Sequence, residues 1–157
     1  MTETEQRLLS TLERLFEVPP AAVDIVLSRC ADLIAETIAA EKVDAFLYEA
    51  AGNCLVAIGT SSTELARLQV ALGLNRLPIA NADPMANVYQ TGEVYLSGQV
   101  EHDPGQPRGV IESMGVRSMA AVPLDVGGLR RGVISLASRK HDSFDHDDIR
   151  FLSVVAA

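Results

Sequence analysis

The segment HDSFDHDDIRFL, residues 141–152, holds two histidines and four aspartates just ahead of an apolar run. Imidazole and carboxylate groups are common metal ligands, so this segment could in principle bind a metal ion. Side chains on one helix converge at spacings of three or four residues, as Asp145 and Asp148 do. His141 precedes any such helix, and His146 is adjacent to Asp145. The spacing therefore does not favour a metal centre, and we expect none.

The same residues fit the start of a helix better. Asp145 is placed to act as the N-cap, because aspartate accepts hydrogen bonds from the free amides of the first turn. Asp147 and Asp148 would lie in that turn, where the helix dipole favours negative charge. Phe144 can pack against Ile149 across the cap. We therefore expect a capped terminal helix.

The two cysteines are candidate nucleophiles. Cys30 and Cys54 both lie in apolar surroundings, in LSRCADLI and GNCLVAIG. Burial raises the pKa of a thiol and suppresses its reactivity, so we expect two inert structural thiols. The sequence shows no signal peptide and no disulfide framework. A reducing cytoplasm is the simplest location.

Composition limits the classes of partner. With 157 residues, 48% of them hydrophobic, the chain is suited to one domain with a single core. It has no run of about 20 apolar residues, so we expect no membrane insertion. Thirteen basic and 21 acidic residues give a net charge of −8, which disfavours binding to nucleic acid or to anionic membranes.

The apolar periodicity changes along the chain from helical to alternating and back. It predicts helices over 1–18 and 20–41, a hairpin over 43–60, helices over 61–72 and 83–92, a strand over 94–98, a short helix over 107–115, strands over 116–126 and 130–140, and the terminal helix. Ser61 or Ser62 is the expected N-cap of the helix over 61–72, and Asp83 that of the helix over 83–92. This order indicates an α+β domain, with helices packed on a central antiparallel sheet. We assign 1–18 to a separate signalling or dimerisation helix and 19–157 to the domain.

The N-terminal helix carries a narrow apolar stripe of Leu8, Leu12 and Leu15. Pro19 and Pro20 separate it from the next helix, so the stripe would face water unless a partner covers it. We therefore expect a homodimer through the terminal helices, although residues 1–18 folded back on their own domain would also cover the stripe. The final helix has no terminating glycine, asparagine or basic turn, which predicts that it continues in a longer protein.

Four segments in order resemble the GAF domain, a ligand-sensing module of signalling proteins. They are TGEVYLSG at 91–98, SMAAVPL at 118–124, GVISLAS at 132–138 and FDHDDIRFL at 144–152. The resemblance covers residues 20–157. It implies that the first and last helices lie on one face of the sheet, with a small-molecule pocket under the middle helices on the other face. It names no ligand, so the cofactor stays unknown.

Specialised branches of that family match less well. Cyclic-nucleotide-binding members carry Asn-Lys, Phe and Asp-Glu where this chain has Ser138-Arg139, Phe144 and Asp148-Ile149, and only Phe144 and Asp148 agree. Bilin-binding members attach their chromophore through a cysteine in the middle region. Members that reduce free methionine sulfoxide also need cysteines there. This chain has no cysteine after Cys54, so none of these branches is favoured.

Six residues are candidates for the pocket of such a domain. They are Tyr89, Tyr95, His102, Arg108, Ser118 and Ser135. His102 could serve as the single axial ligand of a haem, but a histidine in a polar loop is usually only solvated. The tyrosines and Arg108 could bind a small anion or metabolite, or be core and surface residues. The serine hydroxyls could bind a ligand or a neighbouring carbonyl.

The expected function is that of a non-catalytic cytoplasmic sensory GAF domain. It would bind a small molecule and regulate a linked output module in signal transduction, such as a histidine kinase of a two-component system. One alternative is a GAF-fold enzyme such as a methionine sulfoxide reductase. The other is a dimerisation module that binds no ligand.

Overall fold

The computed structural model describes residues 2–16 and 22–156, without the side chains of residues 8 and 11–16. Its helices and strands are α1 (Glu3–Phe16), α2 (Val23–Ile38), β1 (Lys42–Glu49), β2 (Cys54–Thr60), α3 (Glu64–Ala71), β3 (Arg76–Pro78), α4 (Pro84–Thr91), β4 (Tyr95–Ser97), β5 (Ser118–Val126), β6 (Leu129–Ser138) and α5 (His146–Val155). Short helical turns η1 (Ile79–Asn81), η2 (Val100–His102) and η3 (Gly109–Ser113) lie between them. The predicted α+β fold is confirmed.

The six strands form one antiparallel sheet in the order β3-β2-β1-β6-β5-β4. Two predicted hairpins are present, β1 with β2 and β5 with β6, and the second turns at Gly127 and Gly128, both with positive φ. Pairing of β1 with β6 joins the two hairpins. At this junction a Cβ on Gly132 would lie 1.8 Å from the carbonyl oxygen of Phe46, so a side chain there would push the central strands apart.

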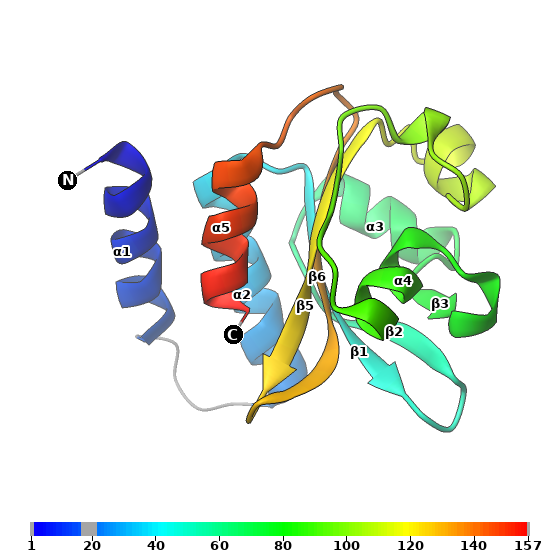
Figure 1. Cartoon of the computed structure of the whole chain (residues 1–157), viewed down its shortest axis with the longest axis horizontal. Coiled ribbons are helices and arrows are strands. Elements are labelled where there is room, and N and C mark those ends of the chain that lie inside the picture. Colours follow the sequence, from blue (N-terminus) through cyan, green and yellow to red (C-terminus); the bar gives the residue numbers. More distant parts are fainter. Residues whose placement is uncertain (1, 17–21, 157) are drawn as a thin grey trace.

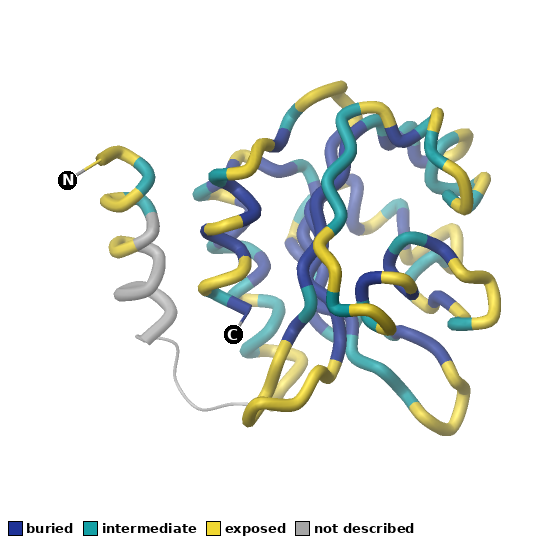
Figure 2. The backbone as a smooth tube through the Cα atoms, viewed as in Figure 1, coloured by how far each residue is buried: buried dark blue, intermediate teal, exposed yellow. Residues whose placement is uncertain are grey.

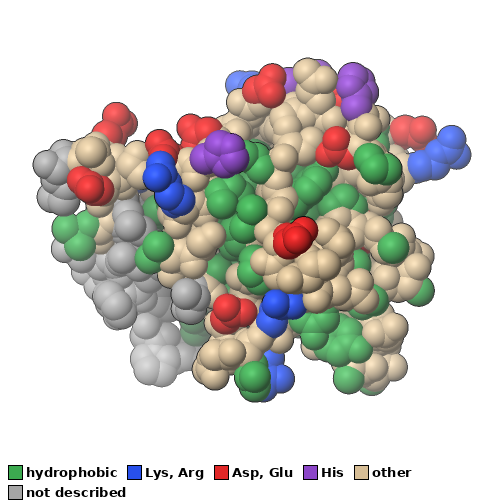
Figure 3. Space-filling view, in the orientation of Figure 1, with side chains coloured by type: hydrophobic (Ala, Val, Ile, Leu, Met, Phe, Trp, Pro, Cys, Tyr) green, Lys and Arg blue, Asp and Glu red, His purple; other side chains and the backbone are tan. Residues whose placement is uncertain are grey.

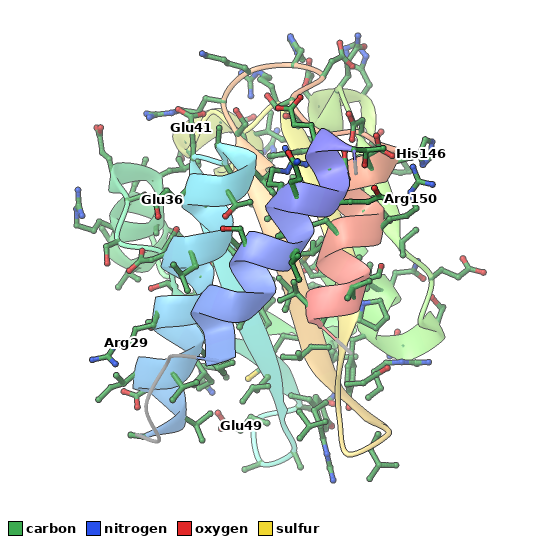
Figure 4. All side chains as sticks on the ribbon, turned by 90° about the vertical axis from the view of Figure 1, so that its left-hand side faces the viewer. Arg29, Glu36, Glu41, Glu49, His146 and Arg150 are labelled. Atoms are coloured by element: carbon green, nitrogen blue, oxygen red, sulfur yellow. The ribbon has the colours of Figure 1, made fainter. Side chains whose placement is uncertain are left out.

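Helices cover both faces of the sheet (Figure 1). We call the side covered by α2 and α5 the helix face, and the side covered by α3 and α4 the pocket face. Helix α1 lies outside the helix face, across α2 and α5 (Figure 4). Helix α2 approaches β2 closely, because Gly59 has no side chain: a Cβ there would lie 2.4 Å from Leu27 Cβ.

Each face of the sheet has its own apolar core, and the strands in the middle of the molecule are buried between them (Figure 2). Strand β6 contributes to both cores, because successive side chains point to opposite faces. Ile134 and Leu136 pack on the helix face, whereas Val133 and Ala137 pack on the pocket face. One strand thus contacts both layers of helices.

The predicted cap of the terminal helix is confirmed. Asp145 accepts a hydrogen bond from the Asp148 amide at 2.9 Å, and the Asp148 carboxylate accepts one from the Asp145 amide at 3.0 Å. Arg7 on α1 donates to the same Asp148 carboxylate at 3.1 Å. Phe144 and Ile149 belong to the same core. The cap therefore fixes the start of α5 and holds α1 beside it.

The expected cap of helix α3 is corrected, whereas the expected apolar stripe of α1 is not tested. The N-cap of helix α3 is Thr63, one residue after Ser62 and two after Ser61, and the Ser61 hydroxyl instead accepts a hydrogen bond from the Val43 amide. The Leu8, Leu12 and Leu15 side chains lie outside the described ones, so the predicted stripe stays a prediction. Among the helices described, none is long and apolar enough to cross a membrane.

Candidate functional site

A pocket lies between the sheet and the middle segments of the chain. Its floor comes from β1, β5 and β6, and its walls from α3, α4 and the segments around β3 and η3. The lining residues are Lys42, Phe46, Gln69, Leu74, Leu77, Asp83, Pro84, Met85, Gln106, Pro107, Val110, Met114, Val116, Met119, Ser135 and Ala137. The free volume is about 20 Å³, which is room for about one water molecule.

Three buried polar side chains pair with one another beside the pocket. Lys42 Nζ donates to Asp44 Oδ2, and Gln69 Nε2 from α3 donates to Asp44 Oδ1 at 3.1 Å. Lys42 and Asp44 are 3% and 0% exposed. Buried charges are tolerated when they are paired and hydrogen-bonded, and here each carboxylate oxygen of Asp44 has a donor. The charge of Lys42 is therefore already compensated.

Asp83 is a second buried carboxylate, and no lysine or arginine side chain that the structure describes forms an ion pair with it. It is the N-cap of α4, where its Oδ1 accepts a hydrogen bond from the Ala86 amide at 2.9 Å, as the sequence predicts. Its Oδ2 is buried and has no hydrogen-bond partner among the described residues. Burial raises the pKa of the Asp83 carboxyl, and the amides of Ala86 and Met85 oppose that shift. One carboxylate oxygen in the pocket lining thus remains unpaired.

The two candidate serines have different roles. Ser135 lies opposite Asp44 on the sheet and lines the pocket, and its buried hydroxyl has no partner among the described groups. Ser118 donates to the carbonyl oxygen of Lys140 at 2.6 Å and does not line the pocket. Ser135 is therefore the serine whose hydroxyl is free to bind a ligand.

The candidate tyrosines lie near the pocket but outside its lining. Tyr95 lines a neighbouring open groove and donates to Asp103, and Gln106 of the pocket donates to the Tyr95 hydroxyl at 3.0 Å. Burial, followed by the hydrogen bond to Asp103, raises the pKa of Tyr95 to about 12, so it stays protonated. Tyr89 stacks on Tyr48 with ring centroids 5.0 Å apart and packs against the pocket-face core.

The remaining candidates are exposed. His102 lies in η2 and does not line the pocket, so the described lining offers no histidine as an axial haem ligand. The Arg108 side chain is exposed and lies 3.8 Å from Glu112. Acidic and basic side chains are scattered over the face in Figure 3 without a large patch of one sign. The segment between β4 and β5 contributes Gln106 and Pro107 to the pocket, rather than the expected His102 and Arg108.

The histidines of the segment 141–152 do not converge. His141 pairs with Glu101 of η2, and His146 is the first residue of α5. Within residues 2–16 and 22–156 there is no group of three or more His, Cys, Asp or Glu side chains that could hold a metal ion. Two aspartates of this segment, Asp145 and Asp148, form the helix cap instead.

Neither cysteine lines the pocket. Cys54 is buried at the start of β2, as predicted, and accepts a hydrogen bond from Arg76 at 3.3 Å. Cys30 is only partly buried, since it lines an apolar cavity on the helix face rather than the inside of the core. Burial still raises the pKa of its thiol. Both cysteines are free.

Sequence reasoning missed four polar residues of the site: Lys42, Asp44, Gln69 and Asp83. A signal for the first two was present, because charges two residues apart in a β-prone run place both on one face of the strand. The sequence predicts only a helix cap at Asp83, and a cap uses one carboxylate oxygen. The position of Gln69 depends on how α3 packs on the sheet.

The fold resembles that of known proteins at low identity. The GAF domain of an Acinetobacter phosphoenolpyruvate-protein phosphotransferase is 12% identical, with a TM-score of 0.79 over 100% of this chain and 90% of that chain. A free methionine-R-sulfoxide reductase from Neisseria meningitidis is 19% identical, with a TM-score of 0.77 over 98% and 83% of the two chains. A comparison with curated protein sequences finds no match.

Sequence comparison also identifies the family. The family model described as "GAF domain" matches residues 20–157, which include every strand and all helices except α1. The sheet, the helices on its two faces and the pocket under the middle helices agree with the arrangement that the resemblance implied. The chain therefore belongs to the GAF domain family.

Proposed function

We propose that this chain is a non-catalytic sensory GAF domain that binds a small molecule in the pocket. The supporting observation is that Asp83 Oδ2 and Ser135 Oγ are both buried in the pocket lining without a hydrogen-bond partner. Buried polar atoms are normally paired, because an unpaired one loses its hydration without compensation. Two such atoms in one pocket support a binding partner from outside the chain.

Two other buried side-chain atoms also lack a partner, but their surroundings differ. Arg7 Nε and Glu101 Oε2 belong to partly exposed residues, and each residue forms an ion pair through another atom, Arg7 with Asp148 and Glu101 with His141. Neither atom lines the pocket. The pocket is therefore the place where two unpaired buried atoms belong to one lining.

Strand β6 offers a route from the pocket to the terminal helices. Ser135 lines the pocket, while its neighbours Ile134 and Leu136 pack in the core with α2 and α5. The Asp125 amide of β5 donates to the Ala156 carbonyl at the end of α5, at 3.0 Å. A ligand that shifts β6 would shift these helices, provided it binds the two arrangements with different affinity. An output module, such as a histidine kinase, would respond to that shift.

The terminal helices also support a homodimer. Leu9 of α1, Val23 and Ile25 of α2 and Val154 of α5 are exposed apolar side chains on the outer helical layer. Apolar contact with a second copy would remove them from water. Light scattering on a chain that starts at Pro19 tests the part played by residues 1–18. An unchanged mass and concentration dependence would show that α1 is not the dimer contact.

A methionine sulfoxide reductase is the second candidate, because enzymes of that activity are among the structural neighbours. Its chemistry needs a thiolate at the bound substrate. Neither cysteine lines the pocket. Cys54 is buried beside Arg76, and Cys30 lines the cavity on the helix face, on the other side of the sheet from the pocket. We therefore expect no reduction of free methionine sulfoxide. Activity that is lost in Cys54→Ser would establish the enzyme and overturn the non-catalytic proposal.

The binding proposal is tested by native mass spectrometry of fresh protein and a thermal-shift screen against nucleotides, haem, small anions and small amines. A ligand raises the melting temperature once its concentration exceeds its dissociation constant. Ala137→Val adds bulk to the pocket floor and should weaken binding. Ala45→Val is the matched control, because Ala45 lines the cavity on the helix face. Absence of any bound mass and any shift, or equal effects of the two variants, would contradict the proposal.

A further inference from the structure

The charge of the pocket restricts its ligand. Asp83 and Ser135 come from different elements, the N-terminus of α4 and the middle of β6, and are 2% and 0% exposed. The unpaired atom of Asp83 is a carboxylate oxygen, which accepts hydrogen bonds and attracts positive charge. The unpaired atom of Ser135 is a hydroxyl oxygen, which both donates and accepts.

The linings of the pocket and of the neighbouring groove offer Asp83 no unpaired lysine or arginine. Lys42 is the basic residue of the pocket lining, and it is bound to Asp44. Asp83 and Pro84 also line the open groove that contains Tyr95 and Asp103, and no lysine or arginine lies among the residues that line it. A phosphate or carboxylate would meet an uncompensated negative charge from either side. A ligand with a protonated amine would supply the missing charge and a donor together.

The rest of the lining indicates the body of the ligand. Most of it is aliphatic, including Leu77, Val110 and three methionines, Met85, Met114 and Met119. Methionine side chains are flexible and adapt to small ligands. The free volume of about 20 Å³ is too small for a nucleotide. A chain of a few carbons requires the least rearrangement of these side chains.

From this geometry we infer that the ligand is a small aliphatic amine. Its ammonium group donates to Asp83 Oδ2, its carbon chain lies along the methionines, and a second polar group bonds to Ser135 Oγ. Because Asp83 and Pro84 line both the pocket and the open groove, the inference places the entrance from solvent at these two residues. This inference rests on the proposed function, because it assigns a ligand class to the same pocket.

Three compounds of one length separate charge from shape: 4-amino-1-butanol, 1,4-butanediol and 4-hydroxybutyrate. Their binding to the whole chain can be measured by titration of the methyl signals of Met85, Met114 and Met119. The amine should bind about tenfold more tightly than the diol, since a charged hydrogen bond is gained. The hydroxy acid should bind most weakly.

Asp83→Asn removes the charge and keeps the helix cap, because asparagine caps helices as well as aspartate does. It should abolish the preference of the pocket for the amine over the diol. Asp145→Asn is the matched control: it makes the same change at the cap of α5, on the helix face, and should keep the preference. Unfolding curves of both variants establish that they are folded.

The outcomes separate the two proposals. If the diol or the hydroxy acid binds as tightly as the amine, or if Asp83→Asn keeps the preference, the ammonium assignment is wrong and the pocket still binds small molecules. If none of the three compounds binds but the wider screen finds a pocket ligand, the ammonium assignment is wrong and the binding proposal stands. If nothing binds in either experiment, both proposals fail.

Discussion

The two faces of the sheet treat buried polar groups differently. On the helix face the core is apolar, and the buried carboxylate of Asp148 is engaged by Arg7 and by the cap of α5. On the pocket face, Asp83 and Ser135 each keep an unpaired atom in one pocket, whereas the unpaired Arg7 Nε on the helix side belongs to a partly exposed side chain that is ion-paired through another atom. Alternate residues of the same strands form both faces, so one sheet combines a stabilising layer with a layer that leaves hydrogen-bonding groups free for a ligand.

The faces also differ in their cavities. The cavity on the helix face is larger, about 120 Å³ against about 20 Å³, but its lining is apolar apart from the Cys30 thiol. A lining of this kind offers almost no directional contact to a polar ligand. The chemistry of the lining, rather than the free volume, is therefore the reason for proposing a ligand site on the pocket face.

The largest effect is expected on the helix face. Leu136 is fully buried there, so Leu136→Ala should lower the free energy of unfolding by about 2–5 kcal/mol through lost burial and the cavity it leaves. Urea denaturation measures the change. A loss below about 1 kcal/mol would mean that this face does not provide the main stability of the sheet.

The cap of α5 should contribute less. Asp145→Ala removes an acceptor from the Asp148 amide and should cost about 1 kcal/mol. A double variant, His141→Ala with His146→Ala, should change stability little, because these side chains do not form a shared site. If zinc or nickel raised the melting temperature and the double variant abolished that rise, the capping account of this segment would be contradicted.

The two capping aspartates should respond to pH with opposite signs. Burial raises the pKa of Asp83, so its protonation stabilises the fold below the ordinary carboxyl range near 3.8, and this stabilisation is lost as the pH rises through the folded pKa. The Asp83→Asn side chain is neutral at every pH, so this variant keeps that stabilisation. It should be more stable than the native chain at neutral pH by up to about 1 kcal/mol.

Asp145 is the reference for that measurement. Its pKa is lowered, chiefly by the hydrogen bond from the Asp148 amide, so its contribution is present above the ordinary carboxyl range and is lost as the pH falls. Asp145→Asn should therefore lose stability at neutral pH relative to the native chain. Thermal unfolding of both variants from pH 3 to about 7 measures whether each substitution raises or lowers stability. If both substitutions change stability in the same direction, the two faces do not differ in this respect.

The smallest effect is expected at Ser135. Ser135→Ala removes an unpaired buried hydroxyl and leaves almost no cavity, so stability should stay within about 0.5 kcal/mol of the native value or rise. Leu136→Ala, at the next residue of β6, is the comparison, because it should lower the free energy of unfolding far more. A loss above about 1 kcal/mol in Ser135→Ala would show that the hydroxyl has a partner within the chain.

The sequence predicted the elements well and the site only in part. Periodicity located the hairpins, and short-range signals located the caps at Asp83 and Asp145, because these depend on residues a few positions apart. The spacing of Lys42 and Asp44 in β1 already places them on one face, whereas the contact of Asp44 with Gln69 depends on how α3 packs on the sheet. Whether a serine is satisfied, as Ser118 is and Ser135 is not, depends on distant backbone groups that no local pattern specifies.

The most direct test of the account compares the two faces in one spectrum. Chains labelled at the methionine and isoleucine methyl groups report on the pocket face through Met85, Met114 and Met119, and on the helix face through Ile34 and Ile134. On titration with the compound that stabilises the protein most, we predict that the methionine signals shift most and that the shifts of the isoleucine signals are smaller. Shifts confined to the isoleucine signals would place the ligand on the helix face and contradict the central claim.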